Sequence, residues 1–234
     1  PARTAEVIGK THPVLPGPRA LATTQDRLVE KDFVRSLGIE TAPYLAVDDG
    51  GALARAVAAI GRPSILKTRR FGYDGKGQTM VRMGADLGGL FRGLGGAPCI
   101  LEGMVRFEKE VSVVAARGHD GQFAAYDPCE NVHENHILAR TVAPAQASDQ
   151  TRARAVEIAR AIAEALDYVG VFAVEMFLVR EAGGERLLVN EIAPRVHNSG
   201  HWTLDGALTS QFEQHIRAIA GWPLGATARH GARV

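Results

Sequence analysis

The chain has 234 residues, 46% of them hydrophobic, and its 27 basic side chains nearly balance 26 acidic ones. This length and hydrophobic content suffice for a buried core in one large or two small domains, which excludes a disordered protein. The net charge of +1 offers no overall field for nucleic acid, and no run approaches the roughly 20 apolar residues that span a bilayer. With only Cys99 and Cys129, the composition predicts a cytoplasmic protein without nucleic-acid or membrane partners.

The first half of the chain predicts two helices and a pair of strands around a glycine-rich loop. A capping pattern at Thr23 and Asp26, followed by apolar residues at helical spacing, predicts a helix that ends at Gly38. An alanine-rich helix is expected over 52–60. Strands are expected over 64–68 and 79–82, with the glycine-rich loop 71–78 between them.

The second half predicts hairpins and two further helices. Strands are expected over 99–105, 110–116, 122–126, 171–179 and 186–192, and helices over 149–167 and 207–220. Several strands follow one another through short turns, such as 118–121. This mixture favours an α+β fold with mainly antiparallel sheets over a doubly wound parallel sheet.

Two glutamates stand on the predicted strands that flank the polar loop 180–185. A hairpin symmetric about this loop places Glu175 opposite Glu191, with Cβ atoms roughly 4.5–5.5 Å apart, where like charges are destabilising. A divalent cation between them removes the penalty, and oxygen-only ligands favour Mg²⁺. One glutamate at a solvated strand end is the alternative. Because Glu175 lies in an apolar run, where an unpaired carboxylate is costly, the metal site is favoured.

The glycine-rich loop carries Gly72, Gly75 and Gly77 around Lys76. Glycines let backbone amides approach phosphate oxygens, and a lysine adds a positive charge. The segment lacks the Lys-Ser/Thr ending and the following helix of a Walker loop, so a flexible hairpin tip remains an alternative. Lys67, on the preceding strand, is either a solvated edge residue or a partner for the same phosphates.

The segment after Glu191 is unusually rich in hydrogen-bond donors, which suit an oxyanion such as bicarbonate or a transferring phosphoryl group. These donors are Arg195, His197, Asn198 and Ser199. A zinc site formed by His197 and His201 requires a helix, which Pro194 and Gly200 disfavour.

Other polar residues give weaker indications. His133 and His136 lie among carboxylates in the segment 128–136, where metal binding is an alternative to the favoured interpretation, a polar connection. Glu102 and Glu110 read as ordinary exposed charges.

Taken together and in this order, these segments resemble the 5-(carboxyamino)imidazole ribonucleotide synthetases, a family of ATP-grasp ligases. The resemblance spans residues 15–234 and is most specific over 190–202; it is carried by Gln25-Asp26-Arg27, Glu30-Lys31, Lys67-Thr68, the segment 73–78, Glu102, Glu110 and the segment 190–202. It implies an ATP-grasp fold of two α+β subdomains that close around a nucleotide. It also implies a purine-biosynthesis reaction in which MgATP, bicarbonate and aminoimidazole ribonucleotide give 5-carboxyaminoimidazole ribonucleotide, ADP and phosphate.

The resemblance further implies a domain plan and an assembly. Residues 1–20 would be the remnant or linker of an N-terminal Rossmann-like domain that the chain lacks, and residues 21–107 the small subdomain with the phosphate loop. Residues 108–234 would be the large subdomain with the magnesium and bicarbonate sites, truncated at its end. A homodimer is implied as well.

Site roles follow from the same resemblance, and they make the chemistry mostly positioning and electrostatics. The residues implied to bind ATP are Lys31, Lys67, Gly72, Gly75, Lys76, Gly77, Gln78, Glu102, Gly103, Met104, Val105, Glu110, His133, Asn190 and Glu191. Among these, residues 72–78 would fold over the phosphates, 102–105 would face adenine, and Glu110 would hold the ribose. Magnesium would be held by Glu175 and Glu191. Tyr73 and Asp74 would reach aminoimidazole ribonucleotide, while bicarbonate and the carboxyphosphate would be oriented by Arg195, His197, Asn198 and Ser199.

Three alternatives remain at this point. One is another ATP-grasp ligase, against which the loop 195–202 discriminates. The second is a fragment that binds nucleotide without turnover. The third is a histidine-liganded metallohydrolase, which would contain bound zinc or manganese.

Overall fold

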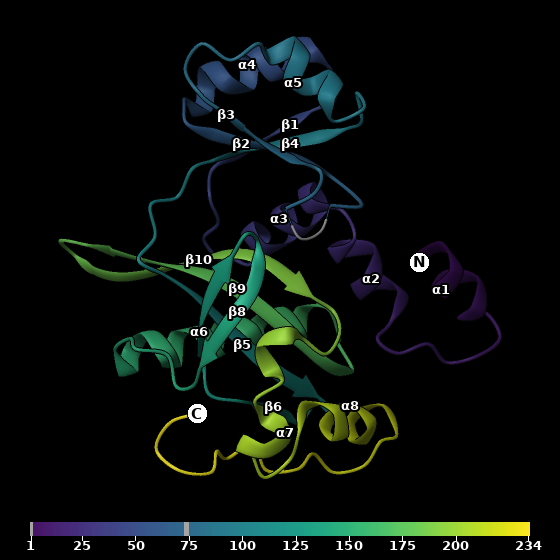
Figure 1. Cartoon of the computed structure of the whole chain (residues 1–234). Helices are drawn as coiled ribbons and strands as arrows, with labels where there is room; N and C mark the ends of the chain where they lie inside the picture. Colours follow the sequence, from purple (N-terminus) through teal and green to yellow (C-terminus); the bar gives the residue numbers. More distant parts are fainter. Residues whose placement is uncertain (1, 73–74) are drawn as a thin grey trace.

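The computed structural model describes residues 2–72 and 75–234, so Tyr73 and Asp74 lie outside the described residues. Its strands form two sheets, and every pairing between named strands is antiparallel. Figure 1 shows the small sheet above the large one, with a helix of the N-terminal region between them. The α+β class with antiparallel sheets is therefore confirmed.

The small sheet is built from four strands in the order β1 (Tyr44–Val47), β4 (Cys99–Gly103), β2 (Ser64–Thr68) and β3 (Gln78–Val81). Helices α4 (Gly50–Ile60) and α5 (Leu87–Gly93) cover its outer face. Leu66 and Leu101 point into the core beneath these helices. Because strand residues alternate between faces, their neighbours Lys67 and Glu102 project from the inner face.

The large sheet has the order β10 (Gly184–Ala193), β9 (Gly170–Glu181), β5 (Lys109–Arg117), β7 (Cys129–Glu134) and β8 (Ile137–Val142), and β6 (Phe123–Ala125) pairs with β5. Helix α6 (Asp149–Ala165) covers one face, where Ile158 and Ile162 join the main core. On the other face, α7 (Thr203–Gly206) and α8 (Gln211–Ile219) cover only one end. The rest of that face lies below the small sheet.

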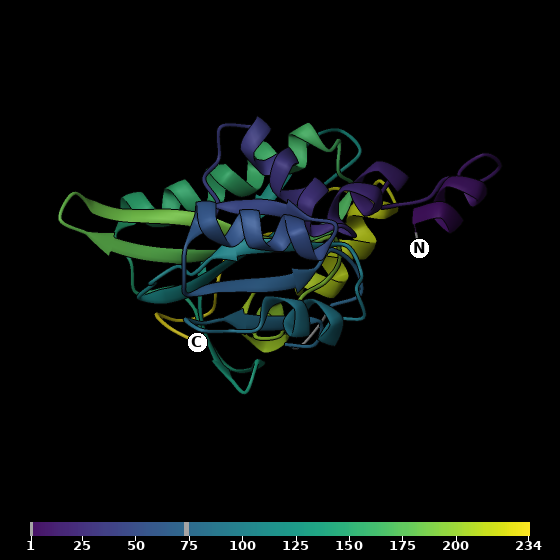
Figure 2. The same ribbon diagram turned by 90° about the horizontal axis from the view of Figure 1, so that it is seen from above.

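Of the three N-terminal helices, the second and third pack on the large sheet, and the first packs against the second. They are α1 (Ala2–Ile8), α2 (Pro18–Thr24) and α3 (Arg27–Ser36), and Ala20, Val34 and Ile39 belong to the core under α6. The sequence assigns residues 21–107 to the small subdomain; within this range, Val34 and Ile39 belong to the core of the large sheet, and Asp26 and Lys31 contact residues of the small one. Seen from above, α1 lies at one side of the molecule, away from both sheets (Figure 2).

Some predicted elements were wrong, each for a local reason. The helix expected from Thr23 is two helices, because Asp26 is extended and accepts hydrogen bonds from the amides of Leu28 and Val29 as the cap of α3. The last helix begins only after Ser210, which caps it in the same way. The segment 128–136, expected to be a polar connection, forms β7 and its turn.

Within the described residues, every helix is too short or too polar to cross a membrane.

Glu185, at the tip of the β9–β10 hairpin, ties this hairpin to the start of α6. Its carboxylate accepts hydrogen bonds from the Thr151 hydroxyl (2.6 Å), the Ser148 amide (3.0 Å) and Arg180 (2.7 Å), which lower its pKa from 4.5 to about 2. A lowered pKa means that the stabilisation is present above pH 4.5 and is lost as the pH falls toward 2. Carboxyl NMR should therefore show Glu185 titrating near pH 2. A Glu185 midpoint near 4.5 contradicts the prediction.

Candidate active site

A β-bulge decides which side chains reach the open face of the large sheet. Val189 pairs with Met176, but the next pair is Glu191 with Glu175, so Asn190 is an extra residue in β10. Val189 and Ile192 both face the core under α6, and the extra residue turns Glu191 to the opposite face, beside Glu175. The opposition of the two glutamates is thus confirmed, although the expected register is wrong over the hairpin tip, where Arg186 pairs with Val179.

Each of these glutamates has a cationic or hydrogen-bonding partner. Arg27 Nη1 lies 3.2 Å from Glu191 Oε2, and His197 Nε2 lies 3.0 Å from Glu175 Oε1. Burial raises the pKa of Glu175, but His197, His133 and Arg195 together outweigh burial and lower it. Glu175 is therefore held as an anion. No cluster of three or more Cys, His, Asp or Glu side chains suited to a metal occurs in the described part of the chain, so the metal prediction rests on this carboxylate pair.

A buried charge cluster links the two subdomains. Glu102 Oε2 lies 2.9 Å from Lys67 Nζ and 3.7 Å from Lys31 Nζ, and all three residues are buried. Burial raises the pKa of Glu102, but Lys67 and Lys31 outweigh it and lower the pKa. Burial in turn lowers the pKa of Lys31, which also donates a 3.1 Å hydrogen bond to the carbonyl of Asn190 in the bulge. Two cations thus meet at the inner face of the small sheet.

Glu30 lies behind this cluster and is fully buried. It accepts a hydrogen bond from the Ile192 amide (3.3 Å), and burial together with the nearby Glu191 raises its pKa well above the usual value. A cavity of about 130 Å³ lies beside it, lined in part by Arg27, Arg70 and Gly72. Charged side chains of α3, of β10 and of the residues just before the glycine-rich loop therefore surround one small space.

The connector between the sheets follows Glu102. Gly103 ends β4, Met104 is exposed, and Phe107 stacks on Phe177 of β9 with ring centroids 4.6 Å apart. Among the described residues, the buried Glu102 Oε1 has no hydrogen-bond partner. An apolar edge beside an unsatisfied acceptor suits a flat heterocycle that carries an amino group.

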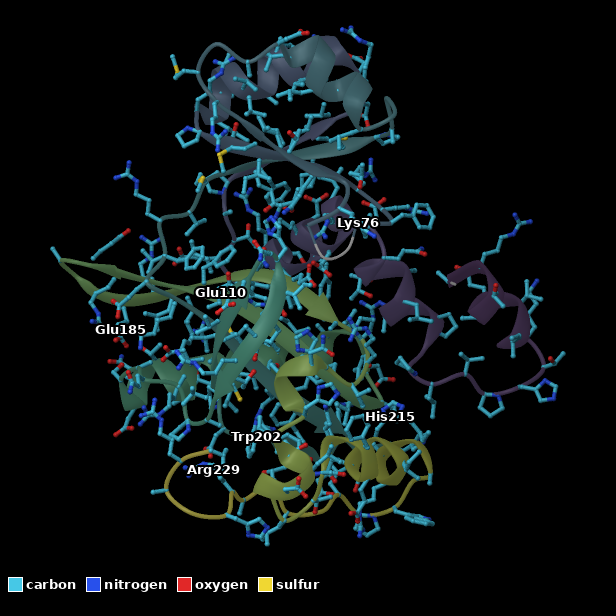
Figure 3. All side chains as sticks on the ribbon, viewed as in Figure 1. Lys76, Glu110, Glu185, Trp202, His215 and Arg229 are labelled. Atoms are coloured by element: carbon cyan, nitrogen blue, oxygen red, sulfur yellow. The ribbon has the colours of Figure 1, made fainter. Side chains whose placement is uncertain are left out.

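Glu110 and His133 lie together on the open face. His133 Nδ1 is 2.5 Å from Glu110 Oε2. Burial and the nearby Glu175 raise the pKa of Glu110, while His133 acts in the opposite direction. Figure 3 shows Glu110 and Lys76 at the level between the two sheets. Glu110 is half-buried and pairs with His133. The expectation that it is an ordinary exposed charge was therefore wrong.

The donor-rich loop divides into outward and inward side chains. Arg195 and Asn198 are exposed, whereas His197 and Ser199 are buried. His197 is extended rather than helical, and His201 stacks on Phe212, so the two histidines have different surroundings. Both ring nitrogens of His197 already contact protein groups, Glu175 and Ser199.

The glycine-rich loop requires glycine at position 77. Gly77 has φ +71°, and a Cβ there would lie 2.6 Å from the Thr68 hydroxyl; its carbonyl also accepts the Thr68 amide (2.7 Å). The substitution Gly77→Ala should therefore cost more stability than the ~1 kcal/mol of a strained backbone alone. Gly84→Ala is the matched control, since Gly84 has φ +74° and open space around it. Urea denaturation measures the free energy of unfolding of both variants. Equal losses of stability in Gly77→Ala and Gly84→Ala contradict the prediction.

Comparison with known proteins agrees with this geometry. A family model described as the ATP-grasp domain matches residues 32–212. The chain belongs to the ATP-grasp family. An N5-carboxyaminoimidazole ribonucleotide synthase of Brucella melitensis is 50% identical over 98% of this chain and 63% of its own length. The sequence-based resemblance to these synthetases is thereby confirmed.

Solved ATP-grasp structures are similar over nearly the whole chain. The synthetase of Thermus thermophilus has a TM-score of 0.91 at 46% identity, covering 99% of this chain and 62% of its own. The synthase of Aspergillus clavatus, solved with ADP and 5-aminoimidazole ribonucleotide, has a TM-score of 0.87 at 30% identity, covering 97% and 59%. The chain thus spans about three fifths of the length of the relatives it matches.

Sequence reasoning missed several residues of this candidate site. Arg27 and Glu30 were noted only as part of the resemblance, and Ser112 and Asn131 were not noted at all. Their signal was present: Glu110 and Ser112 alternate with valines in an otherwise apolar strand, which marks a polar stripe on one face. Asn131 lies in the segment 128–136, where apolar and polar residues show no clear alternation, so its strand was not predicted.

Proposed function

We propose that this chain is the ATP-binding catalytic core of an N5-carboxyaminoimidazole ribonucleotide synthase. Its reaction joins bicarbonate to the exocyclic amine of 5-aminoimidazole ribonucleotide at the expense of ATP. The observation that carries the proposal is the pair Glu175 and Glu191, opposed on the open face of the large sheet below Lys31 and Lys67. The similarity to synthases over nearly the whole chain supports it.

ATP would lie between the two sheets. Glu102 Oε1 and the connector 103–105 suit the adenine, and Glu110 suits the ribose hydroxyls, near His133 and Asn190. Lys31 and Lys67 would attract the phosphates, and residues 72–78 would cover them, with Lys76 and Gln78 adding polar contacts.

The carboxylate pair fits Mg²⁺, which is bound by one or two carboxylates together with substrate phosphates and water. When bound, Mg²⁺ would neutralise charge on the transferring phosphoryl group. Glu175 is kept ionised by His197, as such a ligand must be. Arg27, close to Glu191, would contribute a further positive charge at the same place.

The carboxylation would proceed in two steps. An oxygen of bicarbonate attacks the γ-phosphorus, the bond to ADP breaks, and carboxyphosphate and ADP form. The exocyclic amine then attacks the carboxyl carbon, the C–O bond to phosphate breaks, and the amine proton leaves with phosphate. Arg195 and Asn198 would orient bicarbonate, with His197 and Ser199 behind them, and Tyr73 and Asp74 would contact the ribonucleotide.

The test is phosphate release from MgATP and bicarbonate, with and without 5-aminoimidazole ribonucleotide. Release that requires the ribonucleotide supports the proposal. Release that is equal without it overturns the substrate assignment. ATP-dependent thermal stabilisation without any release would indicate a nucleotide-binding fragment. A homodimer, expected from the family, remains a prediction that sedimentation tests.

A further inference from the structure

A line of buried polar side chains runs through the open face of the large sheet and ends at Glu175. It crosses four strands and the loop 194–202, and each link is a hydrogen bond of 2.7–3.1 Å. In order, its members are Thr141, Asn131, Ser112, Ser199, His197 and Glu175. Ser112 and Ser199 are completely buried, and Asn131 and His197 are nearly so. Buried polar groups are costly unless satisfied, and here each one satisfies the next.

Two contacts of His197 determine which group donates in each hydrogen bond of this line. The Ser199 amide lies 3.3 Å from His197 Nδ1 and can only donate, so Nδ1 is an acceptor without a proton. At the other ring nitrogen, Nε2 faces the carboxylate of Glu175 at 3.0 Å, and an ionised carboxylate can only accept. The imidazole is therefore the neutral tautomer protonated on Nε2.

The donor and acceptor of every other hydrogen bond in the line then follow, because each hydroxyl has only one proton to donate. The Ser199 hydroxyl, 2.9 Å from Nδ1, donates to it and must accept from Ser112. Ser112 has thereby used its proton, so it accepts from the Asn131 amide nitrogen at 2.9 Å. The Asn131 oxygen is left to accept from the Thr141 hydroxyl at 3.1 Å. Every proton along the line points toward Glu175.

We propose that Ser112 and Asn131 are positioning residues that, through Ser199, hold His197 as the Nε2-protonated tautomer and so orient the Glu175 carboxylate. The ring nitrogen that carries the proton is set by the hydrogen bond that the other nitrogen makes. The role in catalysis rests on the proposed function, whereas the tautomer does not. Neither residue touches the substrates in this assignment.

The substitution Asn131→Asp tests the direction. A carboxylate has no proton to give, so Ser112 would turn its own proton toward Asp and accept from Ser199. The Ser199 hydroxyl would then stop donating to His197 Nδ1, which would keep only the longer 3.3 Å contact with the Ser199 amide, so the preference for the Nε2-protonated tautomer would weaken. Ser112→Ala breaks the same line without adding charge. Ser64→Ala is the matched control, since Ser64 is an equally buried strand serine whose hydroxyl has no partner among the described residues.

The first readout is long-range ¹H–¹⁵N NMR of the histidine rings without substrates, with His197 identified among the 8 histidines by its loss in His197→Gln. The expected result is a single Nε2-protonated tautomer in the wild type, and a measurable population protonated on Nδ1 in Asn131→Asp. A wild-type ring protonated on Nδ1 overturns the proposal without any variant. Because no substrate is present, this result is independent of the carboxylation reaction.

The second readout is steady-state carboxylation. We expect Asn131→Asp to lower kcat by about 10 to 100-fold with the KM for ATP unchanged, and Ser112→Ala to act in the same direction. Ser64→Ala should leave both constants unchanged. A wild-type kcat in folded Asn131→Asp overturns the positioning role. Absence of carboxylation in the wild type, with the expected tautomer, overturns the proposed function alone.

Discussion

The substitution Glu191→Gln is expected to lower the rate of phosphate release from MgATP by about 100-fold or more, the size of loss typical for one electrostatic contact at a reacting centre. The side chain keeps its size but loses the charge that opposes Glu175 across the hairpin. With one carboxylate instead of two, the pair would hold Mg²⁺ weakly. Titration of the variant with ATP, in the presence and absence of Mg²⁺, should show that Mg²⁺ no longer strengthens binding.

The matched control for this experiment is Glu213→Gln. Glu213 lies on α8, is exposed, and pairs with Arg217 within its own helix, so its substitution should leave nucleotide binding unchanged. Glu175→Gln should reproduce the loss, because it removes the other member of the pair. A Mg²⁺ dependence that survives in Glu191→Gln would sink the assignment of these carboxylates to the metal.

The position of Glu191 also shows what the sequence could and could not give. Charge and strand pattern correctly predicted that Glu175 and Glu191 face each other. The assumed symmetric loop was nevertheless wrong, because the hairpin turns around a shorter tip and an extra residue in β10, Asn190, restores the pairing. A bulge depends on contacts from other segments, here the Lys31 hydrogen bond to the Asn190 carbonyl. The residue pattern of a single strand cannot predict such a contact with a distant segment.

Long-range partners explain the other differences. Asp26 caps α3 and also binds Arg69 and Arg70, which are distant in the sequence and directly precede the glycine-rich loop. These contacts help to determine where the helix begins. Glu102 looked like an exposed charge because its cationic partners are distant in the sequence. Local patterns therefore predicted the class of the fold and most strands, while the buried charge cluster became visible only in three dimensions.

The second large effect is expected from Glu102→Gln, which should destabilise the chain by about 3–5 kcal/mol, the usual cost of leaving a buried charge uncompensated. Lys31 and Lys67 would remain buried and close together without their shared anion. Since the pKa of Glu102 is lowered, its stabilisation is present above the ordinary value of 4.5 and is lost as the pH falls through the lowered one. The difference between wild type and variant in urea denaturation should therefore shrink in acid.

A second substitution separates this electrostatic cause from simple loss of packing. In Lys67→Met combined with Glu102→Gln, one excess cation is removed, and Lys31 keeps its hydrogen bond to the Asn190 carbonyl. The double variant should therefore be more stable than Glu102→Gln alone, by about 1 kcal/mol or more, because the stability effects of substitutions at contacting residues are not additive. If the double variant instead loses as much stability as the single variants Lys67→Met and Glu102→Gln do in sum, the cluster does not act through charge balance. Since both variants lack part of the proposed nucleotide site, we expect weak ATP binding in each, so stability would recover in the double variant while binding would not.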